Sequence, residues 1–247
     1  MLWTLKYKPQ TLDEITGNND VVCRFKRFVE KKEVPNMIII GPSGVGKITA
    51  VSCMLDALFQ NVKQELKDRY VLHIDASDDR SSKFIKTTIH TFAKIKTSKN
   101  ISMSHKLVII YKADSMTLSV QNDIQTIMEK YKSTCRFCFL FLNPKTIVEP
   151  IQSRCIMILF NKLTIVDIRG RLTNICKKEG VKYTNKGIYA IAFVSNGDMR
   201  RALNSLQSIS YGFDIISHCN VYKVCEHPNS KDVEIIIRYS ENGQFWE

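Results

Sequence analysis

Residues 41–48 read Gly41-Pro42-Ser43-Gly44-Val45-Gly46-Lys47-Ile48, and this stretch decides the fold. It follows a short apolar run, Asn36–Ile40, and leads into a helical pattern from Lys47 to Phe59. Strand, loop and helix in this order are the context in which G-x-x-x-x-G-K-[ST] forms a phosphate-binding loop. The glycines let the backbone approach phosphates, and the helix N-terminus supplies N–H donors. The sequence therefore predicts a site for ATP.

The loop departs from the pattern at its last position, where Ile48 replaces serine or threonine. That hydroxyl ligates Mg²⁺, and isoleucine has no oxygen to offer. Thr49 lies roughly 100° further around the helix and is a poor substitute. ATP binding is expected, whereas bound Mg²⁺ and hydrolysis are in doubt. The predicted loop residues of the nucleotide site are Gly41, Pro42, Ser43, Gly44, Val45, Gly46, Lys47, Ile48 and Thr49.

A second part of the site should follow the apolar strand Leu107–Ile110. In ATPases with such a loop, an aspartate at that strand end supports the metal. Here Tyr111 and Lys112 stand there instead, and Asp114 comes three residues after Tyr111. A lysine about 4 Å from a metal ion would repel it by about 4 kcal/mol per unit charge at an effective dielectric near 20. We therefore interpret 111–112 as a degenerate acidic motif, and our hypothesis is that Lys112 instead neutralises phosphate charge.

Apolar strand patterns alternate with helical ones up to about residue 162, and only helical patterns follow. This order predicts an α/β fold: a parallel sheet with helices on both faces, followed by a small helical domain. A further helix is expected from Ser230 to Tyr239. The expected strands are Asn36–Ile40, Tyr70–Ile74, Leu107–Ile110, Phe137–Leu142 and Ile156–Phe160. The expected helices include 47–59, 83–95, 120–131, 165–176 and 199–209.

The composition narrows the functional classes. The formal charge of +12 and the pI near 9.3 favour a polyanionic partner, although a merely basic surface gives the same numbers. No apolar run approaches the ~20 residues of a membrane span, and the N-terminus lacks a signal-peptide pattern. An intracellular protein without a membrane partner is expected. Cys135 and Cys138 have a metal-like spacing but no second pair, so we interpret them as strand residues.

Several further segments carry a resemblance to a known family. The chain resembles the clamp-loader small subunits of replication factor C over essentially its whole length. The segments that carry this resemblance are Trp3–Pro9, Ile15–Asn18, Ala113–Thr117, Glu149–Cys155 and Gly197–Asn204.

The resemblance implies an AAA+ P-loop ATPase domain over residues 1–162 and a helical lid over 163–228. Residues 229–247 would be the start of a collar domain that is otherwise nearly absent from this sequence. The family forms rings of subunits that load the sliding clamp PCNA onto primer–template DNA, with ATP between the sheet domain and the lid. The expected partners are therefore other replication factor C subunits, PCNA and primer–template DNA, and the expected location is the nucleus.

The resemblance also implies roles for single residues. Asn143 matches the sensor that positions the attacking water, and Arg200 matches the lid sensor near the γ-phosphate. Arg154 matches the arginine finger that acts on ATP bound by a neighbouring subunit. Lys8, Pro9, Ile15, Thr16 and Gly17 match positions near the adenine. Arg80, Lys83 and Lys86 match DNA-backbone contacts, with a solvated basic helix face as the equal alternative.

The chain departs from the family where polar functional residues are expected. The family's residues are replaced by Leu5, Ile48, Ser81, Tyr111, Lys112, Gln125 and Thr126. This pattern favours a clamp-loader-type subunit whose own hydrolysis is slow or absent. Two alternatives stay open: a non-catalytic protein that binds a clamp or a clamp loader, and a degraded gene copy without a role.

Overall fold

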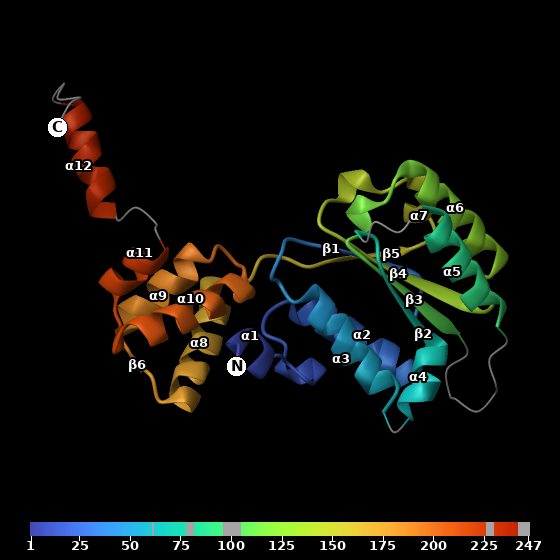
Figure 1. Ribbon diagram of the computed structural model, residues 1–247, viewed down its shortest axis with the longest axis horizontal. Helices are drawn as coiled ribbons and strands as arrows, with labels where there is room; N and C mark the ends of the chain where they lie inside the picture. Colours follow the sequence, from blue (N-terminus) through green and yellow to red (C-terminus); the bar gives the residue numbers. More distant parts are fainter. Residues whose placement is uncertain (61, 78–81, 96–104, 226–229, 242–247) are drawn as a thin grey trace. The chain divides into compact units, whose positions relative to one another are not determined.

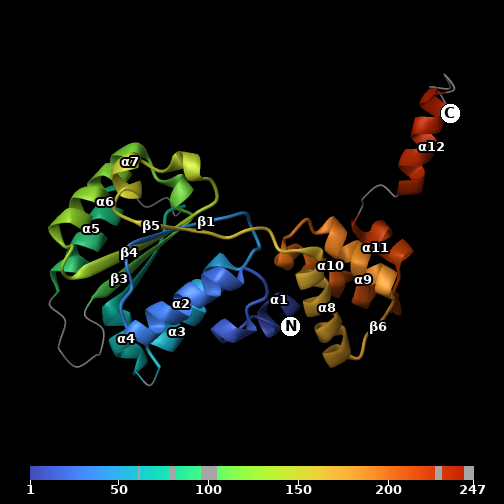
Figure 2. The ribbon, with the colours of Figure 1, turned by 180° about the vertical axis from the view of Figure 1, so that it is seen from behind.

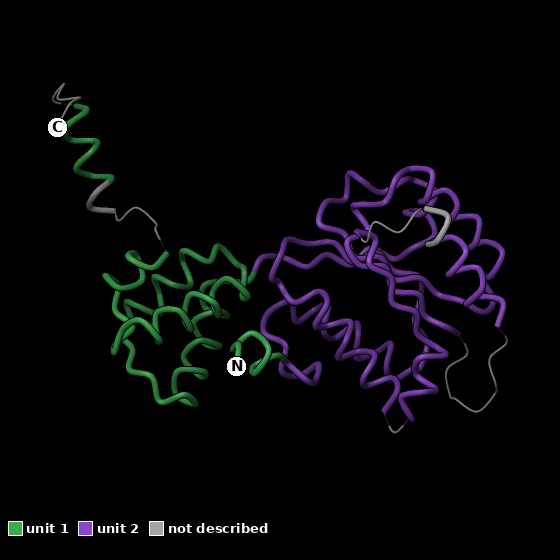
Figure 3. The backbone as a smooth tube through the Cα atoms, in the orientation of Figure 1, with its two compact units in different colours: residues 1–8, 163–247 green, residues 9–162 purple. Residues whose placement is uncertain are grey.

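The computed structural model describes residues 1–60, 62–77, 82–95, 105–225 and 230–241. The chain divides into two compact units, residues 9–162 and residues 1–8 with 163–247 (Figure 3). The division falls after residue 162, and the ATPase and lid bounds expected from the sequence stay predictions. Residues 1–8, which we expected in the sheet domain, group with the helical unit instead. A further boundary at residue 228 stays a prediction.

The larger unit is built on a five-stranded sheet in which every strand pairs in parallel with its neighbours. The strand order is β2-β3-β4-β1-β5, which confirms the predicted parallel α/β sheet. Each expected strand is found within two residues of its predicted bounds. The strands are β1 (Met37–Ile40), β2 (Val71–Asp75), β3 (Lys106–Tyr111), β4 (Cys135–Phe141) and β5 (Ile156–Leu159).

Helices cover both faces of the sheet (Figures 1 and 2). On one face, α2 (Asn19–Lys31), α3 (Lys47–Leu58) and α4 (Gln64–Tyr70) share a core with Ile39. On the other face, α5 (Ser82–Lys94) and α6 (Leu118–Lys130) share a core with Ile38. Successive side chains of a strand point to opposite faces, so one apolar strand supplies both cores. This is why Met37–Ile40 and Leu107–Ile110 are apolar throughout.

The same alternation places the side chains of Cys135 and Cys138 on opposite faces of the sheet. Cys135 belongs to the core beneath α5 and α6, whereas Cys138 belongs to the core beneath α2 and α3. Both thiols are free, and burial raises the pKa of each. The two sulfur atoms therefore lie on opposite faces of the sheet and act as small core side chains, as we expected from the sequence.

Where the structure describes it, the second unit is built of helices and one small parallel pair of strands, β6 (Lys182–Tyr183) and β7 (Ile215–Ile216). Trp3 is buried in its core, which explains why residues 1–8 belong here. The Trp3 N–H donates to Gln207 Oε1 at 2.8 Å, and Arg171 Nη2 donates to Tyr7 O at 2.8 Å. The helices are α1 (Trp3–Lys6), α8 (Ile165–Glu179), α9 (Asn185–Val194), α10 (Met199–Gly212), α11 (His218–Cys225) and α12 (Ser230–Glu241).

Alanine substitutions at two glycines of this unit should change the free energy of unfolding in opposite directions. A Cβ atom on Gly187 would lie 2.3 Å from Ile216 O, so Gly187→Ala should lower the free energy of unfolding by about 1–3 kcal/mol through overpacking. Gly170 lies inside α8 with no atom within 4 Å of such a Cβ, so Gly170→Ala should raise it by about 0.5–1 kcal/mol. Urea unfolding of both variants checks this. Equal stability of the two proteins would contradict the close approach at Gly187.

Candidate nucleotide site

The glycine-rich loop connects β1 to α3 at the edge where the parallel strands end. Gly41 must be glycine here, because a Cβ atom would lie 2.5 Å from Phe160 O and 2.8 Å from Phe160 Cβ. Gly44 and Gly46 have φ angles of 67° and 95°, a left-handed conformation that glycine adopts without strain. The loop thus has the tight, glycine-dependent path that the sequence pattern predicted.

Lys47 is the first residue of α3, and its side chain turns back over the loop. Nζ donates to the carbonyl oxygens of Gly41 at 2.5 Å and Pro42 at 2.8 Å. The first intrahelical bond runs from Ala50 N to Gly46 O at 2.8 Å, so the preceding N–H groups of the first turn have no acceptor within the helix. A cation and a helix N-terminus at one loop form a site suited to phosphates.

Position 48 cannot contribute a metal ligand. The Ile48 side chain is alkyl and 45% exposed, in the place where the loop pattern requires a hydroxyl. The nearby Ser52 hydroxyl donates to Ile48 O at 3.0 Å and is used within the helix.

Tyr111 ends β3 and turns towards β2. Its ring stacks on His73 with an interplanar angle of 8° and a centroid separation of 5.8 Å. A hydrogen bond of 2.8 Å joins Tyr111 Oη and His73 Nδ1. Burial raises the pKa of the phenol to about 12, so it stays neutral at physiological pH. This position therefore supplies no negative charge.

Lys112 has a left-handed backbone conformation, with φ of 47°. Its Nζ lies 3.0 Å from Asp75 Oδ2 and donates to Ser77 Oγ at 2.9 Å. Hydrogen bonds from Ser77, and then the Lys112 charge, hold the pKa of Asp75 below its usual value. The ammonium is thus paired with a carboxylate at the end of β2, a partner that the sequence pattern did not indicate.

The raised pKa of Tyr111 gives a prediction in alkaline solution. The pKa of the Tyr111 phenol is 10.0 in the unfolded chain and about 12 in the folded protein. Between these two pH values the folded state therefore binds more protons than the unfolded state. The free energy of unfolding should therefore fall from pH 10 to 12, and it should fall less steeply for Tyr111→Phe. Urea unfolding of both proteins across this range measures the difference. Parallel curves would show that the phenol is not buried.

Asp114 has a structural role beside the site. Its carboxylate accepts the N–H groups of Leu142 at 2.7 Å and Asn143 at 3.0 Å, directly after β4. Asn143 Oδ1 in turn accepts Lys145 N at 3.0 Å and caps the short 3₁₀ helix Pro144–Thr146. Asp114 therefore fixes the backbone at Asn143, the residue expected to be a sensor, and does not replace the missing acidic motif.

Arg154 follows the short helix α7 (Glu149–Gln152), and its side chain is hydrogen-bonded to residues of the same unit. Nη1 donates to Pro150 O at 2.8 Å, and Nη2 donates to Glu129 Oε1 at 2.5 Å. Gln125 Nε2 also donates to Glu129 Oε1, at 2.9 Å. Hydrogen bonding by Gln125, and then the charge of Arg154, keep the pKa of Glu129 low. The sequence pattern gave no signal for Glu129 as the partner of Arg154.

Comparisons with known proteins decide the family. The family described as "DNA polymerase III, delta subunit" matches residues 10–164, and the "RCF1/5-like, AAA+ ATPase lid domain" matches residues 170–211. Replication factor C subunit 4 of Schizosaccharomyces pombe is 35% identical over 98% of this chain and 69% of its own length. A replication factor C small subunit of Staphylothermus marinus is 36% identical over 99% of this chain and 72% of its own length.

The chain belongs to the replication factor C small-subunit family. The family resemblance and the AAA+ fold class expected from the sequence are confirmed. A RuvB Holliday junction branch migration motor of Thermotoga maritima has the same fold, with a TM-score of 0.69 at 14% identity over 96% of this chain and 80% of that one. An AAA+ fold with this loop is a nucleotide-binding fold.

The replication factor C segment expected near the adenine adjoins α3, the helix of the loop. Cys53 Sγ on α3 donates to Pro9 O at 3.4 Å, and Ile15 packs against the core that contains α3. Gly17 has a φ of 75°, which glycine tolerates. Asn18, which we did not predict, ties this segment to the chain after β5 through Asn161. Its Oδ1 accepts Asn161 N at 2.8 Å, and its Nδ2 donates to Asn161 O at 3.1 Å.

The remaining family positions are distributed as follows. Thr16 lies beside Gly17 ahead of α2, Lys8 lies in the helical unit, and Arg200 is exposed in the first turn of α10. Asp198 caps that helix by accepting Arg201 N at 2.9 Å. Of the DNA candidates, Lys86 pairs with Asp123 at 2.7 Å on the exposed surface. Arg80 lies outside the described residues, and Lys83 belongs to α5 with its side chain outside them.

The residues present fit a nucleotide but not a metal ion. The cradle of the loop, Lys47 and the start of α3 suit phosphates. The two positions that should provide oxygen ligands carry Ile48 and Tyr111. Across the part of the chain that the structure describes, no cluster of three or more His, Cys, Asp or Glu residues could hold a metal ion. None of the described helices is long and apolar enough to cross a membrane.

Proposed function

We propose that this chain is an ATP-binding subunit of a clamp-loader assembly in DNA replication, with slow or absent hydrolysis of its own ATP. One observation carries the proposal. The phosphate loop keeps its glycine geometry and its lysine, while Ile48 and the pair Tyr111–Lys112 replace the metal-holding groups. Lys112 is moreover paired with Asp75. ATP would be held by the residues of 41–49, and the set near the adenine would be Lys8, Pro9, Ile15, Thr16 and Gly17.

The roles of the sensors and of the finger belong to this proposal. Asn143 would face the γ-phosphate from the end of β4, and Arg200 would reach it from the lid. Arg154 would complete the site of a neighbouring subunit. The Arg154 side chain is 39% exposed and that of its partner Glu129 is 49% exposed, so a phosphate could replace that carboxylate. Exposed ion pairs of this kind contribute only about 0–1 kcal/mol to stability. Replacing the Glu129 carboxylate by a phosphate therefore costs little free energy.

The proposed partners follow from the family. They are other replication factor C subunits, the sliding clamp PCNA and primer–template DNA, and the proposed location is the nucleus. Within the family, the segment Asn220–Cys225 favours the subunit 2 branch. Arg80, Lys83 and Lys86 would contact the DNA backbone. For Lys86 this contact requires release of Asp123.

ATP binding without a metal tests the proposal. Titration calorimetry with ATP in EDTA should show binding, because Lys47 and the loop amides supply the positive potential. Lys47→Ala should weaken this binding by about tenfold or more, since a charge-assisted hydrogen bond contributes about 1.5–3 kcal/mol. Lys63→Ala, on an exposed lysine outside the loop, is the matched control. Absence of binding in EDTA together with binding in Mg²⁺ would contradict a site that does not depend on the metal.

A second candidate is a non-catalytic protein that occupies a clamp or a clamp-loader partner. The loss of both oxygen-bearing positions favours it, because binding of a partner does not require hydrolysis. The two functions differ in their use of ATP. Clamp binding that is equal with and without ATP, and unchanged by Lys47→Ala, would support this second candidate over the first.

A further inference from the structure

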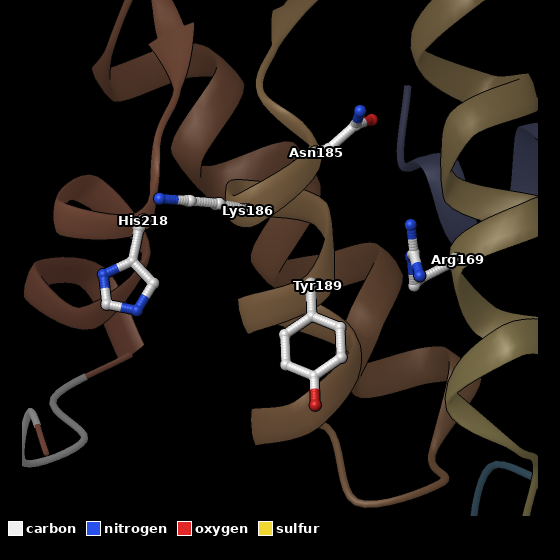
Figure 4. A pocket seen from close by; sticks show the side chains of 5 residues that line it. All are labelled: Arg169, Asn185, Lys186, Tyr189 and His218. Carbon is white, nitrogen blue, oxygen red and sulfur yellow. The ribbon is translucent and has the colours of Figure 1, made fainter.

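A concave site lies within the helical unit, and the residues that line it all belong to that unit. It is a pocket of about 370 Å³ that three helices line (Figure 4). This volume is at the lower end of the range for small-molecule sites. The lining residues are Arg169 from α8, Asn185, Lys186 and Tyr189 from α9, and His218 from α11.

The small β6–β7 pair builds this pocket by holding the starts of α9 and α11 together. Thr184, the residue before α9, donates its N–H to Ile216 O at 3.0 Å. Gly187 in the first turn of α9 lies so close to Ile216 that no side chain would fit between them. His218 begins α11 two residues after Ile216, and its ring lies 4.6 Å from that of Tyr222. The positions of Lys186 and His218 are therefore fixed by backbone contacts.

The pocket is suited to an anion. Arg169 and Lys186 are cations, and no carboxylate is among the five lining residues. The N-termini of α9 and α11 add partial positive charge at the same place. Thr184 Oγ1 accepts the Gly187 N–H at 3.0 Å and thereby caps one donor of the first turn of α9. The pocket therefore combines two full positive charges with two helix starts.

Tyr189 gives the pocket a flat aromatic surface between the two cations (Figure 4). Its side chain is 48% exposed, and Arg169 Cζ lies 5.9 Å from its ring centroid. An exposed ring with flanking cations is the arrangement on which bases of single-stranded nucleic acids stack while their phosphates are neutralised. An acidic peptide would use the cations but would leave the ring without a stacking partner.

We propose that this pocket binds one nucleotide unit of a single-stranded nucleic acid. The base stacks on Tyr189, and the phosphates on its two sides contact Lys186 and Arg169. Recognition is independent of sequence, because every base offers a stacking face. This site belongs to the helical unit, whereas the phosphate loop, Arg80, Lys83 and Lys86 belong to residues 9–162, and it does not depend on ATP binding. Arg169 and Lys186, which contribute to the net charge of +12, thereby have a specific role in binding.

Photo-cross-linking of the full chain tests the site directly. The probe is an oligothymidylate that carries 5-iododeoxyuridine, and mass spectrometry locates the cross-linked peptides. An adduct at Tyr189 is expected, and it should be lost in Lys186→Glu and in Arg169→Glu. Fluorescence anisotropy with the same oligonucleotide at low salt should show that Tyr189→Ala weakens binding about 5-fold or more. The charge variants should also lower the salt dependence of binding, by about one unit of slope each.

Lys177→Glu is the matched control, because Lys177 is an exposed cation on α8 that does not line the pocket. It should keep the adduct. If free thymidine monophosphate prevents formation of the adduct, the pocket recognises a nucleotide by the same chemistry when the ligand is a free nucleotide. Cross-links confined to residues 9–162, or an adduct that both charge-reversal variants retain, would overturn the proposal. Displacement of the oligonucleotide from the pocket by oligoglutamate, without loss of affinity in Tyr189→Ala, would overturn it in favour of an acidic protein partner.

Discussion

Replacing Arg154 by alanine should lower the ATP turnover of a neighbouring subunit by about 10³-fold or more in a mixed clamp-loader assembly, the usual effect of losing an arginine finger. The reason is electrostatic: the guanidinium stabilises the charge that develops on the transferred phosphate. The measurement is turnover at the neighbour's site, in an assembly whose other subunits carry alanine in place of their loop lysines, so that this site alone hydrolyses ATP. The purified subunit alone should show no comparable change.

Two controls separate this role from a structural one. Arg154 lies on the surface, and its bond to Glu129 joins two exposed side chains, so Arg154→Ala should change the free energy of unfolding by only about 0–1 kcal/mol. Glu129→Gln removes the charge that holds Arg154 and keeps the finger, so it should retain the stimulation. Turnover that is unchanged by Arg154→Ala would show that this residue does not act on a neighbour. Equal losses in both variants would indicate that the pair only supports the fold.

The fold was predictable because burial leaves a strong mark on a sequence. Met37–Ile40 and Leu107–Ile110 are apolar throughout, since each strand is covered by helices on both faces. The loop was predictable for a different reason. Gly41 and Gly46 meet backbone requirements that few other residues satisfy, so the pattern survives even where Ile48 has replaced the hydroxyl.

The partners of charged side chains were not predictable in the same way. Lys112 pairs with Asp75 from another strand, and Arg154 pairs with Glu129 from another helix. Such contacts depend on which segments the fold brings together, and no local spacing records them. The same holds for Trp3, whose burial places residues 1–8 in the helical unit. Our hypothesis that Lys112 neutralises phosphate charge stays a prediction. To do so, Lys112 would have to break its ion pair with Asp75.

Restoring the metal site should produce the second large effect. The variant Ile48→Thr, Tyr111→Asp, Lys112→Glu returns a hydroxyl and two carboxylates to the loop and the strand end. Several kcal/mol of transition-state stabilisation by a metal ion correspond to a rise in turnover of about 10²-fold or more. The substitution at position 112 also places a carboxylate near Asp75 and removes its ion pair. The same variant with Asp75→Asn removes that repulsion and should be at least as active.

Single-turnover hydrolysis of ATP by the purified chain in Mg²⁺ tests the central claim most directly, measured beside this triple variant. We predict that the unaltered chain binds ATP and shows no turnover above the uncatalysed reaction, whereas the triple variant hydrolyses it in a Mg²⁺-dependent manner. Lys47→Ala in the triple variant should abolish that activity, which identifies the loop as its site. Robust Mg²⁺-dependent hydrolysis by the unaltered chain would contradict our account of Ile48, Tyr111 and Lys112.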